Sequence, residues 1–118
     1  MDRQPTPINF SALAERFERD SDEMLARLGP IYLDTMPDAI TLLQTVGQSA
    51  DLGNLRDIAH KIRGNAAAIS AERLVELAKT LEKRAHILNK QEAQQLIVQV
   101  SAENERVINW LNQKLNNG

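Results

Sequence analysis

His60 is the residue of this sequence whose type and surroundings best suit covalent chemistry. Residues three, four and seven positions apart share one face of a helix, so Arg56, Arg63 and Gly64 lie on the face of the histidine. A neutral imidazole nitrogen is a nucleophile near neutral pH, and guanidinium groups bind phosphate oxygens. Gly64 leaves the position one turn away without a side chain. The pattern predicts a phosphoryl acceptor; the alternative is an exposed histidine without a role.

Other chemistries have less support. The chain has no cysteine, which excludes disulfides, thiolate metal ligands and cysteine nucleophiles. The second histidine, His86, has one acid, Glu82, four residues before it and no further histidine or acid at ligand spacing, so no zinc site is expected. The glycines are single, and no phosphate-cradling loop precedes a helix. We therefore expect no metal ion or cofactor of the chain's own, no nucleotide site and no kinase activity.

Hydrophobic periodicity predicts helices only. Apolar side chains recur every three or four residues in five segments, and no alternating run indicates a strand. The expected helices cover residues 11–19, 22–46, 51–69, 71–87 and 89–115. Pro30 and Pro37 fall inside the second segment, which is therefore one long kinked helix or two abutting ones.

Polar residues and one glycine mark the expected helix ends. The expected N-caps are Ser11, Ser21 with Asp22, Ser70, and Asn89 with Glu92, which has the spacing of a capping box. The second helix is expected to end at Gly47, and Ser70 is expected to end the third helix as well as to cap the fourth.

Short connections between the later helices favour antiparallel neighbours. We therefore expect an all-α fold: an up-down antiparallel four-helix bundle with a short extra N-terminal helix. Residues 1–9 contain two prolines and are expected to form an N-terminal tail, while residues 10–118 form one domain. A monomer is expected, because the helices show no second apolar face.

Composition agrees with an ordinary globular protein. The 118 residues are 42% hydrophobic and 25% charged, and no apolar run approaches the roughly 20 residues that span a bilayer. A net charge of −2 gives no indication of the basic surface that binds nucleic acid. We expect a cytoplasmic protein without direct membrane contact. Residues 51–90 carry 8 bases and 5 acids, an imbalance that is either chance or a surface for an acidic partner.

Two stretches resemble the histidine-phosphotransfer family. Residues 59–67, Ala-His-Lys-Ile-Arg-Gly-Asn-Ala-Ala, are similar to its A-H-x-L-K-G-x-A pattern, and residues 74–82, Leu-x-x-Leu-Ala-x-x-Leu-Glu, to the helix that follows. With the flanking helices, the resemblance covers about residues 10–118. It implies a phosphorelay intermediate of two-component signalling, which accepts a phosphoryl group on His60 from a receiver-domain aspartate and passes it to a response-regulator aspartate.

The resemblance also implies roles for single residues. His60 would be phosphorylated, in this family usually on Nε2, and Gly64 would give clearance to the partner. Arg63 stands where lysine is common. Glu82 occupies the position whose side chain can hydrogen-bond the other ring nitrogen and fix the tautomer; the alternative is a solvated surface acid. Ser70 departs from the glycine that is common there, which puts the local turn in doubt rather than the function.

The implied partners are receiver domains of response regulators and hybrid sensor kinases, which would supply Mg²⁺ and most of the chemistry. Arg56, Lys61 and Ala67 are expected to face them. Apolar contacts from Ala67 and the second helix would give most of the affinity, while charges steer the encounter. The sequence fits a free-standing protein or the end of a hybrid kinase.

Two other functions are alternatives to the relay. In the first, the chain is a non-catalytic helical adaptor in which His60 is incidental. In the second, it is a metal or cofactor bundle, which needs inward-facing carboxylates and histidines that the apolar stripes lack.

Overall fold

The computed structural model describes residues 6–17, 20–49 and 51–117, and within these ranges its regular structure is entirely helical. The helices are α1 (Phe10–Phe17), α2 (Ser21–Ser49), α3 (Leu52–Ala68), α4 (Glu72–Arg84) and α5 (Lys90–Asn117). The expected all-α fold is confirmed. None of these helices, over the residues described, has the length and apolar character that a membrane span requires.

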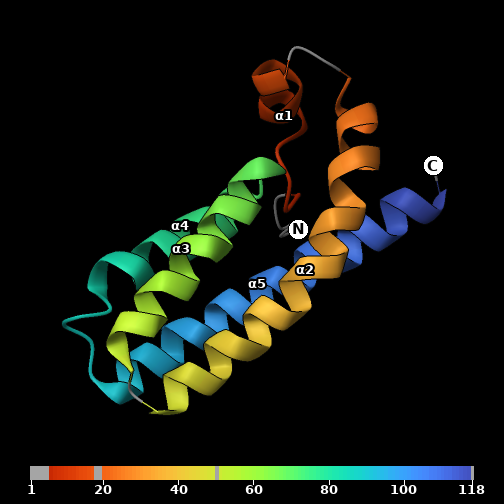
Figure 1. Ribbon diagram of the computed structural model, residues 1–118. Coiled ribbons are helices and arrows are strands. Elements are labelled where there is room, and N and C mark those ends of the chain that lie inside the picture. Colours follow the sequence, from red (N-terminus) through yellow and green to blue (C-terminus); the bar gives the residue numbers. More distant parts are fainter. Residues whose placement is uncertain (1–5, 18–19, 50, 118) are drawn as a thin grey trace, which may run out of the picture.

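Helices α2 to α5 run alternately up and down and form a four-helix bundle (Figure 1). Each packs against its two neighbours in the cyclic order α2, α3, α4, α5. α2 and α5 are longer than α3 and α4, and their far ends extend beyond the α3–α4 turn. α1 packs against α2 in that region, as the extra N-terminal helix.

The core is aliphatic and follows the predicted stripes closely. On α3 the buried positions are Leu55, Ile58, Ala59, Ile62, Ala66 and, just after the helix, Ile69. Ile31 fits the three- and four-residue apolar spacing of the second segment, which predicts a core position, but it is 61% exposed. The buried face of α2 passes through Tyr32 and Met36, and Ile31 lies about 100° around the helix from Tyr32.

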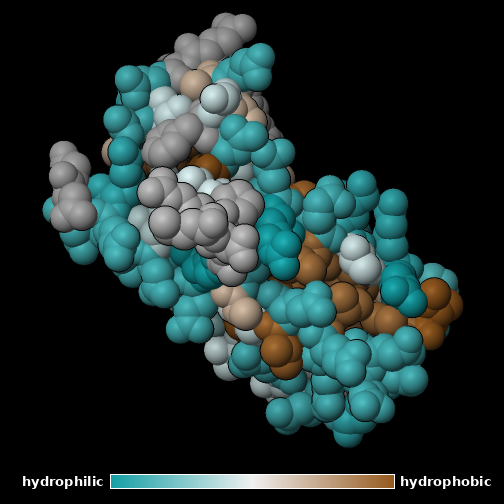
Figure 2. All heavy atoms as spheres, turned by 180° about the vertical axis from the view of Figure 1, so that it is seen from behind, coloured by the Kyte–Doolittle hydropathy of each residue, from teal (hydrophilic) through white to brown (hydrophobic). Residues whose placement is uncertain are grey.

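Hydrophobic side chains also reach the surface. Seen from behind, they gather in a strip towards one end of the molecule (Figure 2). The large exposed ones include Ile87 in the α4–α5 connection and Val98 on α5. The outer surface of the bundle is therefore not uniformly polar.

α2 is one continuous helix that contains Pro30 and Pro37 and continues past Gly47 to Ser49. The expected end at Gly47 is therefore wrong. Gly47 is buried, and a Cβ there would lie 2.3 Å from Cδ1 of Ile97 on α5. This glycine allows close approach of α2 and α5, instead of ending the helix in a left-handed conformation.

The first two helices start earlier than predicted. The side chain of Asn9, not Ser11, caps α1 by accepting a backbone N–H bond of the first turn at 3.0 Å. The side chain of Asp20 caps α2 by accepting from the N–H of Asp22 at 2.7 Å, so Ser21 and Asp22 lie inside the helix instead of capping it. Apolar periodicity locates a helix but does not fix its first residue.

The predicted starts of α3 and α5 are confirmed. Asp51 caps α3 by accepting from the N–H of Asn54 at 3.2 Å. In the capping box of α5, the N–H of Glu92 donates to the Asn89 side chain at 2.8 Å, and the N–H of Asn89 donates to the Glu92 carboxylate at 3.1 Å. These bonds satisfy N–H groups that the helices leave unpaired.

Ser70 ends α3 in the left-handed conformation, with a φ of 57°. Its N–H donates to the carbonyl of Ala67 at 3.0 Å, and that of Ala71 donates to the carbonyl of Ala66 at 2.9 Å. This pair of bonds is a Schellman motif, in which glycine is the usual left-handed residue. The prediction that Ser70 ends α3 is right, but α4 is capped at Ala71 without a side-chain hydrogen bond.

Residues 6–9, which were predicted to belong to a tail, pack on the bundle. Ile8 is 1% exposed. The N–H of Asn9 donates to the carbonyl of Ser70 at 2.9 Å, and the Asn9 side chain donates to Glu72. This segment therefore closes over the α3–α4 turn. Residues 1–5 of the predicted tail lie outside the described residues.

Two polar side chains interrupt the apolar face of α5. Glu103 and Asn104 are both buried, and the hydroxyl of Tyr32 donates to the Asn104 side chain. Burial and the nearby charge of Glu103 raise the pKa of Tyr32, so the hydroxyl keeps the proton that it donates. The sequence pattern did not predict these buried polar contacts.

The strain at Ser70 predicts that Ser70→Gly stabilises the protein. A left-handed residue with a Cβ is unfavourable, so the free energy of unfolding should rise by about 0.5–1 kcal/mol, net of the greater freedom of glycine in the unfolded chain. Urea unfolding measures the change. Ser101→Gly, within α5, is the matched control and should instead lower stability. A loss of stability in Ser70→Gly would contradict the account of this turn.

Candidate functional site

His60 lies on the outer face of α3, and its side chain is 64% exposed. Ala59 and Ile62 of the same helix are completely buried. Because those positions face the core, the helix register turns the imidazole outward, as predicted.

Glu82 reaches His60 from α4. Its Oε1 lies 2.7 Å from Nδ1 of the imidazole. An unprotonated Nδ1 would point its lone pair at a carboxylate oxygen, which is repulsive at this distance, so we infer that Nδ1 carries the proton and donates it. Nε2 then holds the lone pair of the neutral ring, and it makes no hydrogen bond to the residues that the structure describes.

Arg63 completes the cluster from one turn further along α3. Its Nε lies 2.8 Å from Oε2 of Glu82, in an ion pair that lacks hydrogen-bond alignment. Its Nη2 donates to Oε1 of Glu82 at 3.5 Å and lies 3.1 Å from Nδ1 of His60. The guanidinium and the imidazole therefore share one carboxylate.

Glu82 is held in its ionised form. Partial burial raises the pKa of the Glu82 carboxyl, but the hydrogen bond from His60 and the charges of Arg63 and His60 lower it by more, so the net shift is downward. An ionised carboxylate accepts hydrogen bonds only, which is the role required opposite a protonated Nδ1.

Gly64 is exposed, and a Cβ built on it would meet nothing within 4 Å. Packing within this chain therefore does not require glycine here. Arg56, which was predicted to flank the histidine, is exposed and lies 3.7 Å from the carboxylate of its neighbour Asp57. Of the residues predicted around His60, the structure brings Arg63 and Glu82 into contact with it, and it pairs Arg56 elsewhere.

An open groove of about 740 Å³ lies beside His60, between α2 and α3. Its apolar lining consists of Ala39, Leu42, Val46 and Ile58, with His60 and Lys61 also among the lining residues. Leu42 is 52% exposed. A groove of this kind offers apolar contact area next to the candidate phosphoacceptor.

The sequence led to only part of this groove. The sequence predicted that Lys61 contacts a partner. It also predicted partner contacts from the second helix, but it did not indicate which residues make them. The available signal was Leu42, which is apolar but lies about 100° around the helix from the buried Leu43, outside the stripe that Leu43 shares with Ile40. Ala67 lies away from the groove and lines a hollow with Ala12 and Val75, on the side of α1 and α4.

Metal ligands do not gather in the part of the chain that the structure describes. No group of three or more histidine, cysteine, aspartate or glutamate side chains there could hold an ion. His86 is exposed in the α4–α5 connection.

The lowered pKa of Glu82 predicts how stability depends on pH. Glu82→Gln should lower the free energy of unfolding at pH 7 by up to about 1 kcal/mol, the usual size of a partly exposed ion pair. The folded pKa lies below the ordinary value of 4.5. The carboxylate's contribution is therefore present above pH 4.5 and is lost as the pH falls through the folded pKa.

Urea unfolding of both proteins between pH 7 and pH 3 measures this difference, which should shrink at the acidic end. Glu76→Gln replaces an exposed acid of the same helix and serves as the control. A stability difference that grows on acidification would show that the sign is wrong.

Comparison with known families identifies the family of the chain. The family model described as the Hpt domain matches residues 30–111, which include most of α2 and α5, all of α3 and α4, and both His60 and Glu82. The chain matches no curated protein and no solved structure. Since the family match covers well over half of the 118 residues, the chain belongs to the Hpt domain family, the phosphocarriers of histidine phosphotransfer in two-component signalling.

Proposed function

We propose that this protein accepts a phosphoryl group on Nε2 of His60 from the aspartyl phosphate of a receiver domain and passes it to an aspartate of a response regulator. The observation that carries the proposal is the contact between Glu82 and Nδ1 of His60 at 2.7 Å. It occupies one ring nitrogen as a donor and leaves the other exposed as a nucleophile.

In the transfer step, the Nε2 lone pair attacks phosphorus and the bond between phosphorus and the aspartyl oxygen breaks. The electron pair of that bond stays on the aspartate, which leaves as a carboxylate. Nδ1 keeps its proton, so the phosphorylated ring is cationic. The Glu82 carboxylate offsets this charge, and Arg63 beside it attracts the phosphoryl oxygens. Transfer to the second aspartate is the same exchange in reverse.

The receiver supplies the magnesium ion and most of the catalysis, and this chain acts as a carrier without kinase activity. We propose that the receiver docks over His60 and uses the groove between α2 and α3. Leu42 and Ile58 supply apolar contact there, while Lys61 and Arg56 attract the acidic receiver pocket. In this proposal the protein works as a monomer in the cytoplasm.

Within the family, we propose a likeness to the C-terminal phosphotransfer domain of the anoxic redox control type of hybrid sensor kinase. The similarity rests on residues 60–64, His-Lys-Ile-Arg-Gly, on Met36-Pro37, and on residues 107–111, Val-Ile-Asn-Trp-Leu. Met36, Ile62, Val107 and Leu111 are buried, so each of the three segments contributes to the core of the bundle.

Labelled phosphate tests the relay directly. Phosphorylated receiver domains should transfer label to the wild type and to His86→Gln, the control at the other, exposed histidine. His60→Gln should receive no label. The label on the wild type should be acid-labile and base-stable, as expected of phosphohistidine. Label on folded His60→Gln would contradict the proposal. If the wild type receives no label and His60→Gln still binds the receiver, the alternative function as a non-catalytic adaptor would be favoured.

Gly64→Ala separates stability from transfer. Alanine favours a helix interior, and the added Cβ meets nothing in this chain, so the free energy of unfolding should rise by about 0.5–1 kcal/mol. The same Cβ would obstruct a docked receiver, so we expect the transfer rate to fall at least tenfold. Gly53→Ala, at another exposed glycine of α3, is the control and should transfer normally. Wild-type transfer by Gly64→Ala would refute the clearance role.

A further inference from the structure

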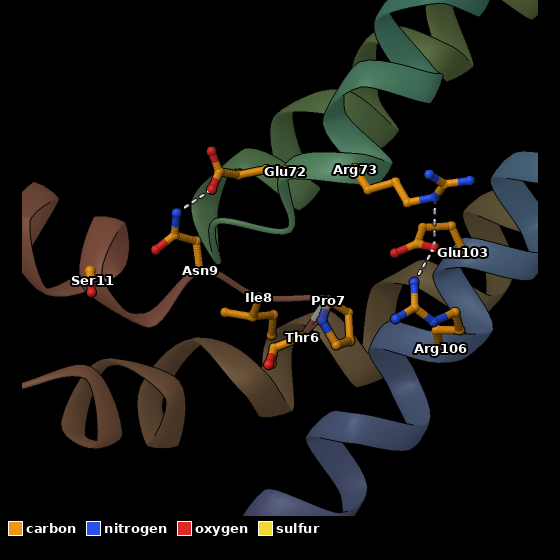
Figure 3. Close-up of a pocket in the computed structure, with 9 residues that line it drawn as sticks. All are labelled: Thr6, Pro7, Ile8, Asn9, Ser11, Glu72, Arg73, Glu103 and Arg106. Carbon is orange, nitrogen blue, oxygen red and sulfur yellow. Dashed lines mark hydrogen bonds and ion pairs between the residues drawn. The ribbon is translucent and has the colours of Figure 1, made fainter. Parts of the chain in front are cut away.

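A second hollow, of about 480 Å³, lies where the N-terminal segment meets α4 and α5 (Figure 3). It is bounded by residues 6–9, by Glu72 and Arg73 in the first turn of α4, and by Glu103 and Arg106 on α5. None of these residues belongs to the His60 site. Glu72 precedes Glu82 by about 15 Å along α4, so the hollow is a separate place on the molecule.

Glu103 places a buried carboxylate in the wall of this hollow, with 4% of its surface exposed. Oε1 lies 2.8 Å from Nη1 of Arg106 and 3.3 Å from Nε of Arg73. Oε2 is buried and accepts no hydrogen bond from the residues described. In Figure 3 the second oxygen points away from both arginines, towards the N-terminal segment. A buried carboxylate oxygen without a donor is unfavourable, so Oε2 calls for a donor that enters the hollow.

Arg73 presents the complementary group beside it. Its side chain is 68% exposed, and only Nε is used, towards Glu103. The two terminal nitrogens contact no acceptor in the described part of the chain. A guanidinium whose two terminal nitrogens have no acceptor can bind a carboxylate through two parallel hydrogen bonds, because the group is planar.

The two groups together select the charge of a ligand. A simple anion would meet Arg73 but be repelled by Oε2 of Glu103, and a simple cation would meet Oε2 but be repelled by the arginines. The nearby acid Glu72 already accepts a hydrogen bond from Asn9. A molecule with an ammonium next to a carboxylate satisfies both groups at once.

We propose that this hollow binds a free α-amino acid, with its ammonium on Oε2 of Glu103 and its carboxylate on the terminal nitrogens of Arg73. Pro7 gives the wall an apolar part that the ligand side chain can contact. The volume of about 480 Å³ leaves room for such a side chain.

NMR titration of the full 118-residue chain tests the proposal, using L-leucine and L-serine as probes with an apolar and a polar side chain. Backbone amides of residues 6–9, 72–74 and 103–106 should shift saturably with at least one of them. N-acetyl-L-leucine lacks the ammonium and L-leucinamide lacks the carboxylate, so both should bind at least tenfold more weakly than L-leucine. Inorganic phosphate is the probe for a simple anion site.

Variants identify the contacts. Arg73→Gln, at an exposed position, should weaken binding at least tenfold without loss of folding, and Glu103→Gln should do the same where it folds. Arg84→Gln, an exposed arginine of α4 away from the hollow, should bind as the wild type does. The proposal fails if neither amino acid gives saturable shifts, if the two derivatives or phosphate shift the same amides as strongly, or if Arg73→Gln binds normally.

Discussion

Oε1 of Glu82 lies 2.7 Å from Nδ1 of His60 across two antiparallel helices, and this contact leaves Nε2 as the ring nitrogen without a partner in the described residues. It requires α3 and α4 to pack closely and in one register. Ala59 and Ala66 of α3 and Ala78 of α4 are fully buried, and small side chains of this kind permit close approach of helices. The Schellman turn at Ser70 then reverses the chain within a few residues, so that α4 returns alongside α3.

The sequence predicted what depends on local periodicity. The outward orientation of His60 follows from the buried residues on either side of it on one helix, and it could be read without knowing what packs there. The capping box of Asn89 and Glu92 is equally local. The contact between His60 and Glu82 was expected only through the family resemblance, because the two residues lie on different helices and no spacing rule relates them.

What the sequence did not predict depends on how the helices approach each other. Gly47 reads as a helix end, yet it is buried because α5 lies against it. The groove forms because Leu42 is left uncovered between two helices, and Glu103 occupies a core position only because two arginines from different places reach it. Each of these features is a property of a pair of elements, and a periodic pattern describes one element at a time.

The most direct test of the account is the tautomer of His60 in the unphosphorylated protein, read from the ¹⁵N chemical shifts of its ring nitrogens at a pH where the ring is neutral. The account predicts a protonated Nδ1 and an unprotonated Nε2, as the contact with Glu82 requires. A proton on Nε2 instead would mean that Glu82 does not prepare this nitrogen for phosphorylation, and the central claim would be wrong.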